Sequence, residues 1–364
     1  MEKKFGRAKS MSLTVKNSGP DIMDTYFNHP VWKQKWGEPI PDMPLDVQLE
    51  LINSCNLACD SCPILHQTRI KSSLTWEVLK RIADESAEES VCYFTICGIG
   101  EAALHPKLFE FLRYVRNKTV KPKGLRTLTT MPTILISNAV WPQKHIQQCI
   151  DHPPDMLSLS LAGLTDEEHI ARRSPINLDK FFQNVKALHD GRKLRRPEDG
   201  RLAPTIHIST HIYPHEMTNH EAIQAFEKKW LQISDAVVIK PTMIDQHHMR
   251  LKEFSTPSNL QYTDISTNHF SRTAPCMETS RRLSIDSNGD IWCGHHNSED
   301  FGPLLGNVYH NSLREIWHSD TMNEFRREVR AGIFHREGCQ KCGGEIRDWH
   351  REVPKTIEKE IKFQ

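Results

Sequence analysis

The chain has 364 residues, of which 38% are hydrophobic and 26% charged, and its formal net charge is +1. This length accommodates one large domain with a smaller one, or two ordinary domains, and the composition is that of a globular protein. A near-neutral charge argues against a protein that binds nucleic acid by neutralising phosphates. No apolar run approaches the ~20 residues that span a bilayer, and the basic N-terminus lacks the apolar stretch of a secretory signal. We therefore expect a cytoplasmic protein with neither nucleic acid nor a membrane as its partner.

Residues 1–44 indicate an N-terminal arm, which we expect to be loose through residue 16. From 45 to 241, short β-type runs alternate with helix-type runs. We expect strands at 45–51, 91–96, 133–136, 156–161, 205–212 and 236–239. We expect helices at 75–90, 106–117, 142–150, 166–172, 178–189 and 219–233.

Six β–α repeats predict a parallel sheet with helices outside it. They are too few for a closed eight-stranded barrel. The predicted fold is therefore α/β, a partial (β/α)6 TIM-like barrel, with function on loops at the carboxyl ends of the strands.

The rest of the chain predicts a loop, a linker and a second module. Residues 192–203 are polar and predict an exposed loop, and 242–275 show no steady period and predict a linker. Residues 276–364 predict a small α+β module. It begins with a β-hairpin over 283–292, where Asn288-Gly289 is a strong tight-turn signal, and continues with a helix over 312–330.

Seven of the ten cysteines fall into two groups, which in a reducing cytosol point to metal binding or catalysis. The first group, Cys55, Cys59 and Cys62, follows the first expected strand. Three thiolates can ligate three irons of one cubane cluster and leave the fourth iron open, whereas simple iron–sulfur proteins use four cysteines. A zinc site would need four ligands, and His66 offers a Cys3His alternative. The spacing favours the cluster and leaves zinc open.

This Cys-x3-Cys-x2-Cys spacing resembles that of the radical S-adenosylmethionine (SAM) superfamily. Gly98-Ile99-Gly100-Glu101 resembles the family's glycine–glutamate motif, which holds the methionyl amino group of SAM. Glycines there allow close backbone approach, and a carboxylate suits an ammonium partner. The resemblance covers residues 45–241. It implies two cofactors, SAM and a 4Fe–4S cluster, and an electron donor such as flavodoxin or ferredoxin.

Further motifs follow later strands in the family's order. The matching residues are Ser137 and Asn138 for Thr-Asn-Gly, Ser160 and Gly163 for Ser-x-Asp-Gly, and Arg173 for a SAM-binding arginine. Each motif alone is weak, since such residues also serve as helix caps or ordinary turns. Their joint order supports the resemblance.

Four positions depart from the family pattern. They are Ser61 for an aromatic that packs on adenine, Ala102 for proline, Ala139 for glycine and Ala162 for aspartate. These departures affect details of cofactor contact and remove no cluster ligand.

The second group is Cys276, Cys293, Cys339 and Cys342, whose four soft ligands suit zinc or a second iron–sulfur cluster. The arrangement resembles the twitch domain, a shortened SPASM domain, because no cysteine follows Cys342. The resemblance implies one auxiliary 4Fe–4S cluster. The layout is similar to that of aminocyclitol alcohol dehydrogenases, which implies oxidation of a carbinol carbon with the auxiliary cluster accepting an electron.

Three residues are candidates for the chemistry. Cys97 adjoins the glycine motif and could return a hydrogen atom, although it also fits a plain strand end. His207 and His211 alternate on one expected strand, and either could accept a proton or merely line the barrel. Cys92 and Cys149 are expected in the core.

The main expectation is a radical SAM oxidoreductase acting on a small molecule or peptide. Alternatives are a radical epimerase that uses Cys97, a peptide-modifying maturase and a non-catalytic zinc-binding scaffold.

Overall fold

The computed structural model describes residues 13–16, 40–60, 62–126, 128–194, 202–213, 216, 218–241, 278–293, 302–336 and 339. The predicted linker at 242–275, together with Cys276 and Cys342, lies outside these residues.

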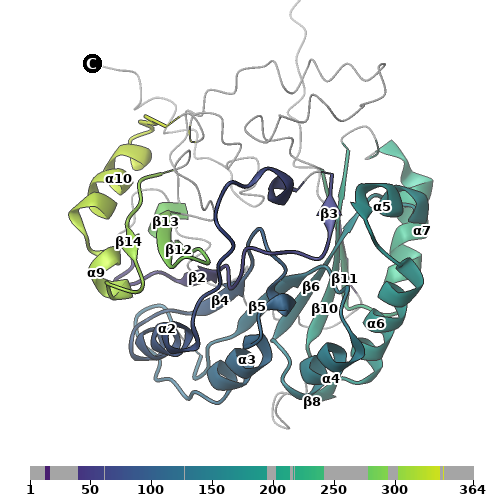
Figure 1. Ribbon diagram of the computed structural model, residues 1–364, viewed down its shortest axis with the longest axis horizontal. Helices are drawn as coiled ribbons and strands as arrows, with labels where there is room; N and C mark the ends of the chain where they lie inside the picture. Colours follow the sequence, from purple (N-terminus) through teal and green to yellow (C-terminus); the bar gives the residue numbers. More distant parts are fainter. Residues whose placement is uncertain are drawn as a thin grey trace, which may run out of the picture.

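A curved ten-stranded sheet organises the described chain, in the order β1-β11-β10-β6-β5-β4-β2-β12-β13-β14 (Figure 1). Its central parallel strands are β2 (Asp46–Leu49), β4 (Tyr93–Ile96), β5 (Thr133–Ser137), β6 (Met156–Ala162), β10 (Thr205–Ile212) and β11 (Ala236–Pro241). Each of the six lies where the sequence predicted a strand. The α/β partial-barrel prediction is confirmed.

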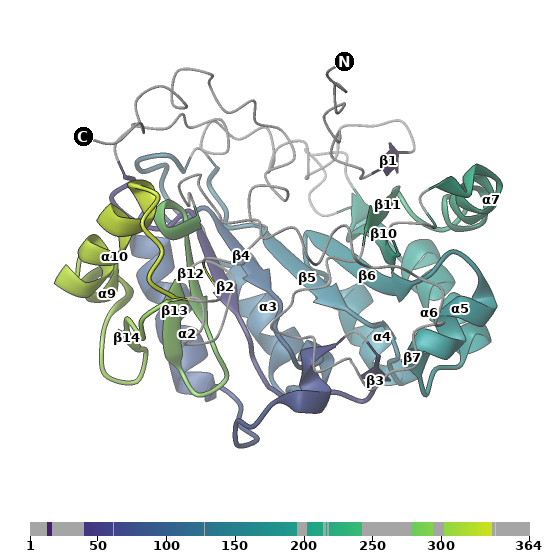
Figure 2. The same cartoon turned by 90° about the horizontal axis from the view of Figure 1, so that it is seen from above.

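Helices cover the outer side of this sheet in an arc (Figures 1 and 2). They are α2 (Trp76–Glu88), α3 (Leu108–Arg116), α4 (Gln143–Asp151), α5 (Asp166–Arg172), α6 (Leu178–Asp190) and α7 (His220–Trp230). Side chains that accept backbone N–H groups cap four of them: Thr75, Thr165, Asn177 and Asn219. The helices therefore begin close to where the sequence predicted.

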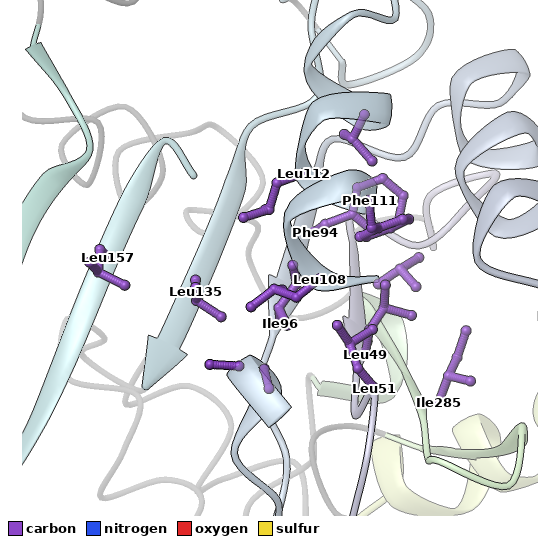
Figure 3. Packing of buried hydrophobic residues seen from close by; sticks show 14 of the residues in the cluster. Leu49, Leu51, Phe94, Ile96, Leu108, Phe111, Leu112, Leu135, Leu157 and Ile285 are labelled. Carbon is purple, nitrogen blue, oxygen red and sulfur yellow. The ribbon is translucent and has the colours of Figure 1, made fainter. Parts of the chain in front are cut away.

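The core lies between the sheet and these helices. Phe94 packs against Phe111 of α3, and Leu49, Leu135 and Leu157, from neighbouring strands, belong to the same buried cluster (Figure 3). Because strand side chains alternate, the intervening residues point to the other, concave face of the sheet. That face carries polar side chains and is the one on which a ligand can lie.

The C-terminal hairpin extends the same sheet. Strands β12 (Arg282–Ile285) and β13 (Asp290–Cys293) form the predicted hairpin, and Gly289 adopts a φ of +85° in its turn. Strand β12 pairs in parallel with β2, and β14 (Gly306–Asn307) adds to β13 (Figure 2). The hairpin is thus hydrogen bonded directly to the first strand of the barrel.

Three segments differ from expectation. The arm contains β1 (Leu13–Lys16), which pairs antiparallel with β11. The loop at 192–203 includes a short ladder of β8 (Lys193–Leu194) and β9 (Leu202–Ala203). The helix predicted at 312–330 is two helices, α9 (Leu313–Trp317) and α10 (Asp320–Arg330), because the side chain of Ser319 caps a new helix.

Candidate cofactor site

The first cysteine loop is attached to the end of α5. Strand β3 (Ala58–Cys59) pairs antiparallel with β7 (Arg173–Ser174), and the N–H of Asp60 donates to the carbonyl of Arg172 at 3.0 Å. The Arg172 guanidinium in turn donates to Glu216 at 3.1 Å and lies 4.4 Å from the ring centre of Tyr213. The loop is therefore fixed at the edge formed by the carboxyl ends of the parallel strands.

N–H groups donate to all three sulfur atoms, and the donor to Cys62 is the backbone N–H of Ile64. The Leu57 backbone N–H lies 3.4 Å from Cys55 Sγ, and Asn138 Nδ2 lies 3.7 Å from the same atom. Arg173 Nε donates to Cys59 Sγ at 3.4 Å. Such donors stabilise thiolates, which are the form that ligates iron.

Burial affects the protonation of these thiols in the protein chain alone. It raises the pKa of Cys55, and it raises the pKa of Cys62 to about 11. In the chain alone, Cys55 and Cys62 are therefore thiols at neutral pH, and binding of a cluster would displace their protons. Among the described residues, no three His, Cys, Asp or Glu side chains converge on one ion position. A cubane cluster does not require this, since each cysteine ligates a different iron.

The two glycines of the second motif allow close packing of the chain on itself. A Cβ at Gly98 would lie 2.4 Å from Glu50 Cγ, and one at Gly100 would lie 2.0 Å from the Ile52 carbonyl oxygen. Neither contact is possible for a larger residue. The motif is therefore pressed against the end of β2, next to the cysteine loop.

Glu101 joins two of the predicted motifs. Its buried carboxylate accepts hydrogen bonds from Ser137 Oγ at 2.7 Å, Asn138 N at 2.8 Å, Ala103 N at 3.2 Å and Trp141 Nε1 at 3.2 Å. A carboxylate offers about four acceptor positions. In this arrangement Glu101 holds the loops after β4 and β5 together. The sequence did not indicate this structural role.

The loop after β6 needs glycine at one position. Gly163 has a φ of +107°, and a Cβ there would lie 2.5 Å from Glu168 Cβ. His169 Nδ1 accepts the N–H of Ala162 at 3.0 Å, and burial lowers the pKa of His169 to about 3, so the ring is neutral. Ser160 is half-buried and lies on β6, three residues before Gly163.

Ala139 has a left-handed backbone, with φ at +52°, although it is not glycine. The sequence marked this position because the family pattern has glycine here. The structure supplies the reason, since the chain turns through a conformation that glycine adopts without strain.

The candidates for chemistry lie on different parts of the concave face. Strand pairing aligns His207 with Ser158, and His211 with Ala162, so the two histidines share one face of the sheet. His207 is 3% exposed, whereas His211 is exposed. Cys97, half-buried, follows β4. Cys92 and Cys149 are buried in the core, as predicted.

Of the second cysteine group, only Cys293 and Cys339 lie among the described residues. Cys339 is buried, and the backbone of Cys293 ends β13 opposite Leu283. Leu283 pairs with Val47 near the amino end of β2, whereas Cys55 follows the carboxyl end of that strand. Cys293, one described member of the second group, therefore lies near the amino end of β2, and the first cysteine loop follows its carboxyl end.

Three charged residues at the site were not found from the sequence. Glu50, Arg69 and Asp286 meet next to the glycine motif, with Arg69 Nη1 2.7 Å from Glu50 Oε1 and 3.4 Å from Asp286 Oδ2. One signal existed, because Glu50 is a charged residue that alternates with apolar residues in a segment predicted to be a buried strand. Neither Arg69 nor Asp286 stands out in its own segment.

Two family models match parts of the chain. Residues 49–193 match the Radical SAM superfamily, and residues 276–343 match the SPASM iron–sulfur cluster-binding domain. No curated protein sequence matches the chain significantly. The chain therefore contains a radical SAM domain with a SPASM region C-terminal to it. Its cofactors are SAM, the radical SAM 4Fe–4S cluster and the iron–sulfur cluster of the SPASM domain.

Solved structures show the same fold at low identity. Native anSMEcpe with bound AdoMet has a TM-score of 0.53 and 15% identity, covering 84% of this chain and 88% of that one. SuiB from Streptococcus suis, bound to its precursor peptide SuiA, has a TM-score of 0.50 and 15% identity, with coverage of 83% and 70%. BtrN in complex with AdoMet and 2-DOIA has a TM-score of 0.47 and 13% identity, with coverage of 80% and 88%.

None of the helices in the described ranges is both long and apolar enough to cross a membrane.

Proposed function

We propose that this radical SAM protein is a dehydrogenase-type oxidoreductase that removes two electrons from a carbinol carbon of a small polar substrate. When bound, the cofactors supply a 5′-deoxyadenosyl radical that takes the carbinol hydrogen atom and an auxiliary cluster that takes the second electron, while a base takes the hydroxyl proton to leave a carbonyl. The observation that carries the proposal is the position of β12 and β13. They join the segment ending in Cys293 to β2, with the first cysteine loop at the opposite end of that strand.

We assign cofactor binding to the residues at the carboxyl edge. Cys55, Cys59 and Cys62 ligate the first cluster. The buried Arg173 has an Nη1 without a hydrogen-bond partner, and this free donor suits the carboxylate of SAM. The remaining residues that we place around SAM are Gly98, Gly100, Glu101, Ser137, Asn138 and Ser160.

Glu101 has two roles in this proposal. Its carboxylate accepts the donors named above, so it positions Ser137 and Asn138. Three of the four hydrogen bonds end on Oε1 and one, from Asn138 N, on Oε2, which leaves Oε2 an acceptor position. The ammonium group of SAM would be held there, beside backbone acceptors of the glycine motif.

The proton acceptor is proposed to be His207 or His211, which face the same side of the sheet as Ser158 and Ser160. A neutral imidazole close to a substrate hydroxyl can take its proton. The second cluster is assigned to Cys276, Cys293, Cys339 and Cys342. The electron that starts the reaction would come from a donor such as flavodoxin or ferredoxin.

Cysteine replacement tests the assignment of the two clusters. Replacing Cys55, Cys59 and Cys62 with alanine should leave about four irons per chain in place of about eight, and SAM cleavage should stop. Replacing Cys339 and Cys342 with alanine should preserve SAM cleavage and hydrogen abstraction but strongly reduce oxidised product. Full product formation by the second variant would overturn the electron-acceptor role.

A radical epimerase is the second candidate, because Cys97 follows β4 and its side chain is half-buried. An epimerase must return a hydrogen atom, which a thiol can donate. Under that function, Cys97→Ala would stop turnover and leave SAM cleavage intact. Under the dehydrogenase function, Cys97→Ala should still form oxidised product.

A further inference from the structure

The Glu50 carboxylate is the meeting point of four separate segments. It is 1% exposed. Its Oε1 accepts Arg69 Nη1 at 2.7 Å and the Ser287 N–H at 3.3 Å, and its Oε2 accepts Arg69 Nη2 at 3.1 Å and the Ile99 N–H at 2.8 Å. These four bonds use the acceptor positions that a carboxylate has. Glu50 therefore holds the glycine motif, the segment after the cysteine loop and the hairpin turn at once.

Arg69 connects Glu50 to the hairpin. Its Nη1 lies 3.4 Å from Asp286 Oδ2. Asp286 is 1% exposed and accepts the N–H groups of Asn288 and Asp290 at 2.8 and 3.1 Å, so it also shapes the β12–β13 turn. Beside this pair, Ser72 Oγ and Ser287 Oγ lie 2.7 Å apart.

The hydrogen bonds of Glu50 fix a definite geometry, unlike a non-directional attraction between opposite charges. A guanidinium that pairs in a bidentate way fixes both distance and orientation. Gly98 leaves no free space over Glu50, since a Cβ there would lie 2.4 Å from Glu50 Cγ. A movement of the hairpin turn must therefore be transmitted to the backbone of Ile99, within the proposed SAM-binding motif.

We propose that Glu50, Arg69 and Asp286 are positioning residues that make the SAM-binding loop and the auxiliary-cluster hairpin one unit. SAM affinity then depends on residues of the C-terminal module that never touch SAM. The inference rests on the proposed function in that Gly98–Glu101 is taken as the SAM-binding motif. It does not depend on which reaction follows.

The test measures SAM dissociation constants and hydrogen–deuterium exchange on cluster-loaded protein under anaerobic conditions. Glu50→Gln and Arg69→Met should weaken SAM binding about tenfold or more, as expected for loss of charge-assisted hydrogen bonds. Both should also raise deuterium uptake over residues 283–293. Asp286→Asn should raise the SAM dissociation constant and the deuterium uptake as well, but by smaller amounts. Arg69→Lys should raise both less than Arg69→Met does, because lysine keeps the positive charge.

Arg314→Met is the matched control. Arg314, on α9, also links the C-terminal region to the barrel, with its Nε 2.6 Å from Glu89 Oε1. Its side chain is partly exposed, and no hydrogen bond described for it reaches the glycine motif. Its loss should leave SAM affinity unchanged. Unchanged affinity and unchanged exchange in the Glu50, Arg69 and Asp286 variants would overturn the inference. Failure of the wild type to cleave SAM would instead overturn the proposed function.

Discussion

The concave face of the sheet has two unlike halves. One half, around β2 and β12, carries charged side chains that are bonded to one another, such as Asp46 with Arg282 and, just after β2, Glu50 with Arg69. The other half, on β6 and β10, presents hydroxyl and imidazole groups. Its side chains on this face are those of Ser158, Ser160, His207, Ser209 and His211.

This difference indicates that the charged half serves as a scaffold and that the half on β6 and β10 is the surface for a ligand. A buried charge is costly unless it is paired, so the charged half is committed to holding the chain together. Neutral hydroxyl and imidazole groups can exchange a water molecule or a neighbour for a substrate at much smaller cost. We therefore place the polar substrate over β6 and β10, with the hydrogen bonds of the other half holding the segment after the first cysteine loop and the hairpin that ends in Cys293 in position.

The largest effect should follow from breaking a pair in the charged half. Asp46 is fully buried and accepts Arg282 Nη2 at 2.7 Å and Thr95 Oγ1 at 3.0 Å. Asp46→Asn removes the buried partner of Arg282, which keeps the longer contact to Glu278 at 3.6 Å, and should lower the free energy of unfolding by about 3 kcal/mol. Denaturant unfolding measures this. The double change Asp46→Leu with Arg282→Met should recover most of the loss, and SAM cleavage per folded molecule should be unchanged throughout.

A substitution in the neutral half should have the opposite pattern. His207→Gln should slow formation of oxidised product by roughly 100-fold, a typical contribution of general acid–base catalysis, while the free energy of unfolding changes by about 1 kcal/mol. His211→Gln is the matched variant on the same face. Product formation and SAM cleavage are measured together. If both histidine variants make product at the wild-type rate, the substrate does not use this half for its proton transfer.

The border between the halves offers a smaller test at Ala139, after β5. Ala139→Val places a β-branched side chain at a positive φ and should cost about 1–3 kcal/mol of stability. Ala139→Gly should stay within about 1 kcal/mol of the wild type, because relief of strain is offset by the greater entropy of the unfolded chain. Thermal unfolding of the two variants compares them. Equal loss in both would mean that the backbone conformation is not the cause.

The smallest effect concerns pH and an ion pair on the outer surface. Hydrogen bonding from Arg314 lowers the pKa of Glu89 from 4.5 to about 2. A carboxylate with a lowered folded-state pKa contributes stability above its unfolded pKa and loses it as the pH falls from about 4.5 towards 2. Arg314→Met should weaken this pH dependence, although Lys123 still lies 2.8 Å from Glu89 Oε2, and at neutral pH it should cost about 1 kcal/mol or less. Unfolding measured from pH 6 to pH 3 checks the difference between the two proteins. Parallel curves would contradict it.

The sequence predicted the strands well because alternating and apolar runs report directly on burial. The cysteine, glycine and Ser137-Asn138 motifs were found for a similar reason, since each lies in one short segment after a strand. What the sequence did not show are pairings between distant segments. Glu50 and Asp286 are far apart in the chain, and nothing local indicates that β12 pairs with β2. Helix α10 was missed as a separate helix, although Ser319 is a recognisable cap.

The central claim is that the two cysteine groups serve a two-electron oxidation across the neutral half of the face. The most direct measurement is the mass of the product formed in heavy water by the wild-type enzyme with its true substrate. The account predicts a product two hydrogen atoms lighter than the substrate, with no solvent deuterium at the carbon that lost its hydrogen. A product of unchanged mass, or one heavier by a single deuterium, would contradict it and favour the hydrogen-returning role of Cys97.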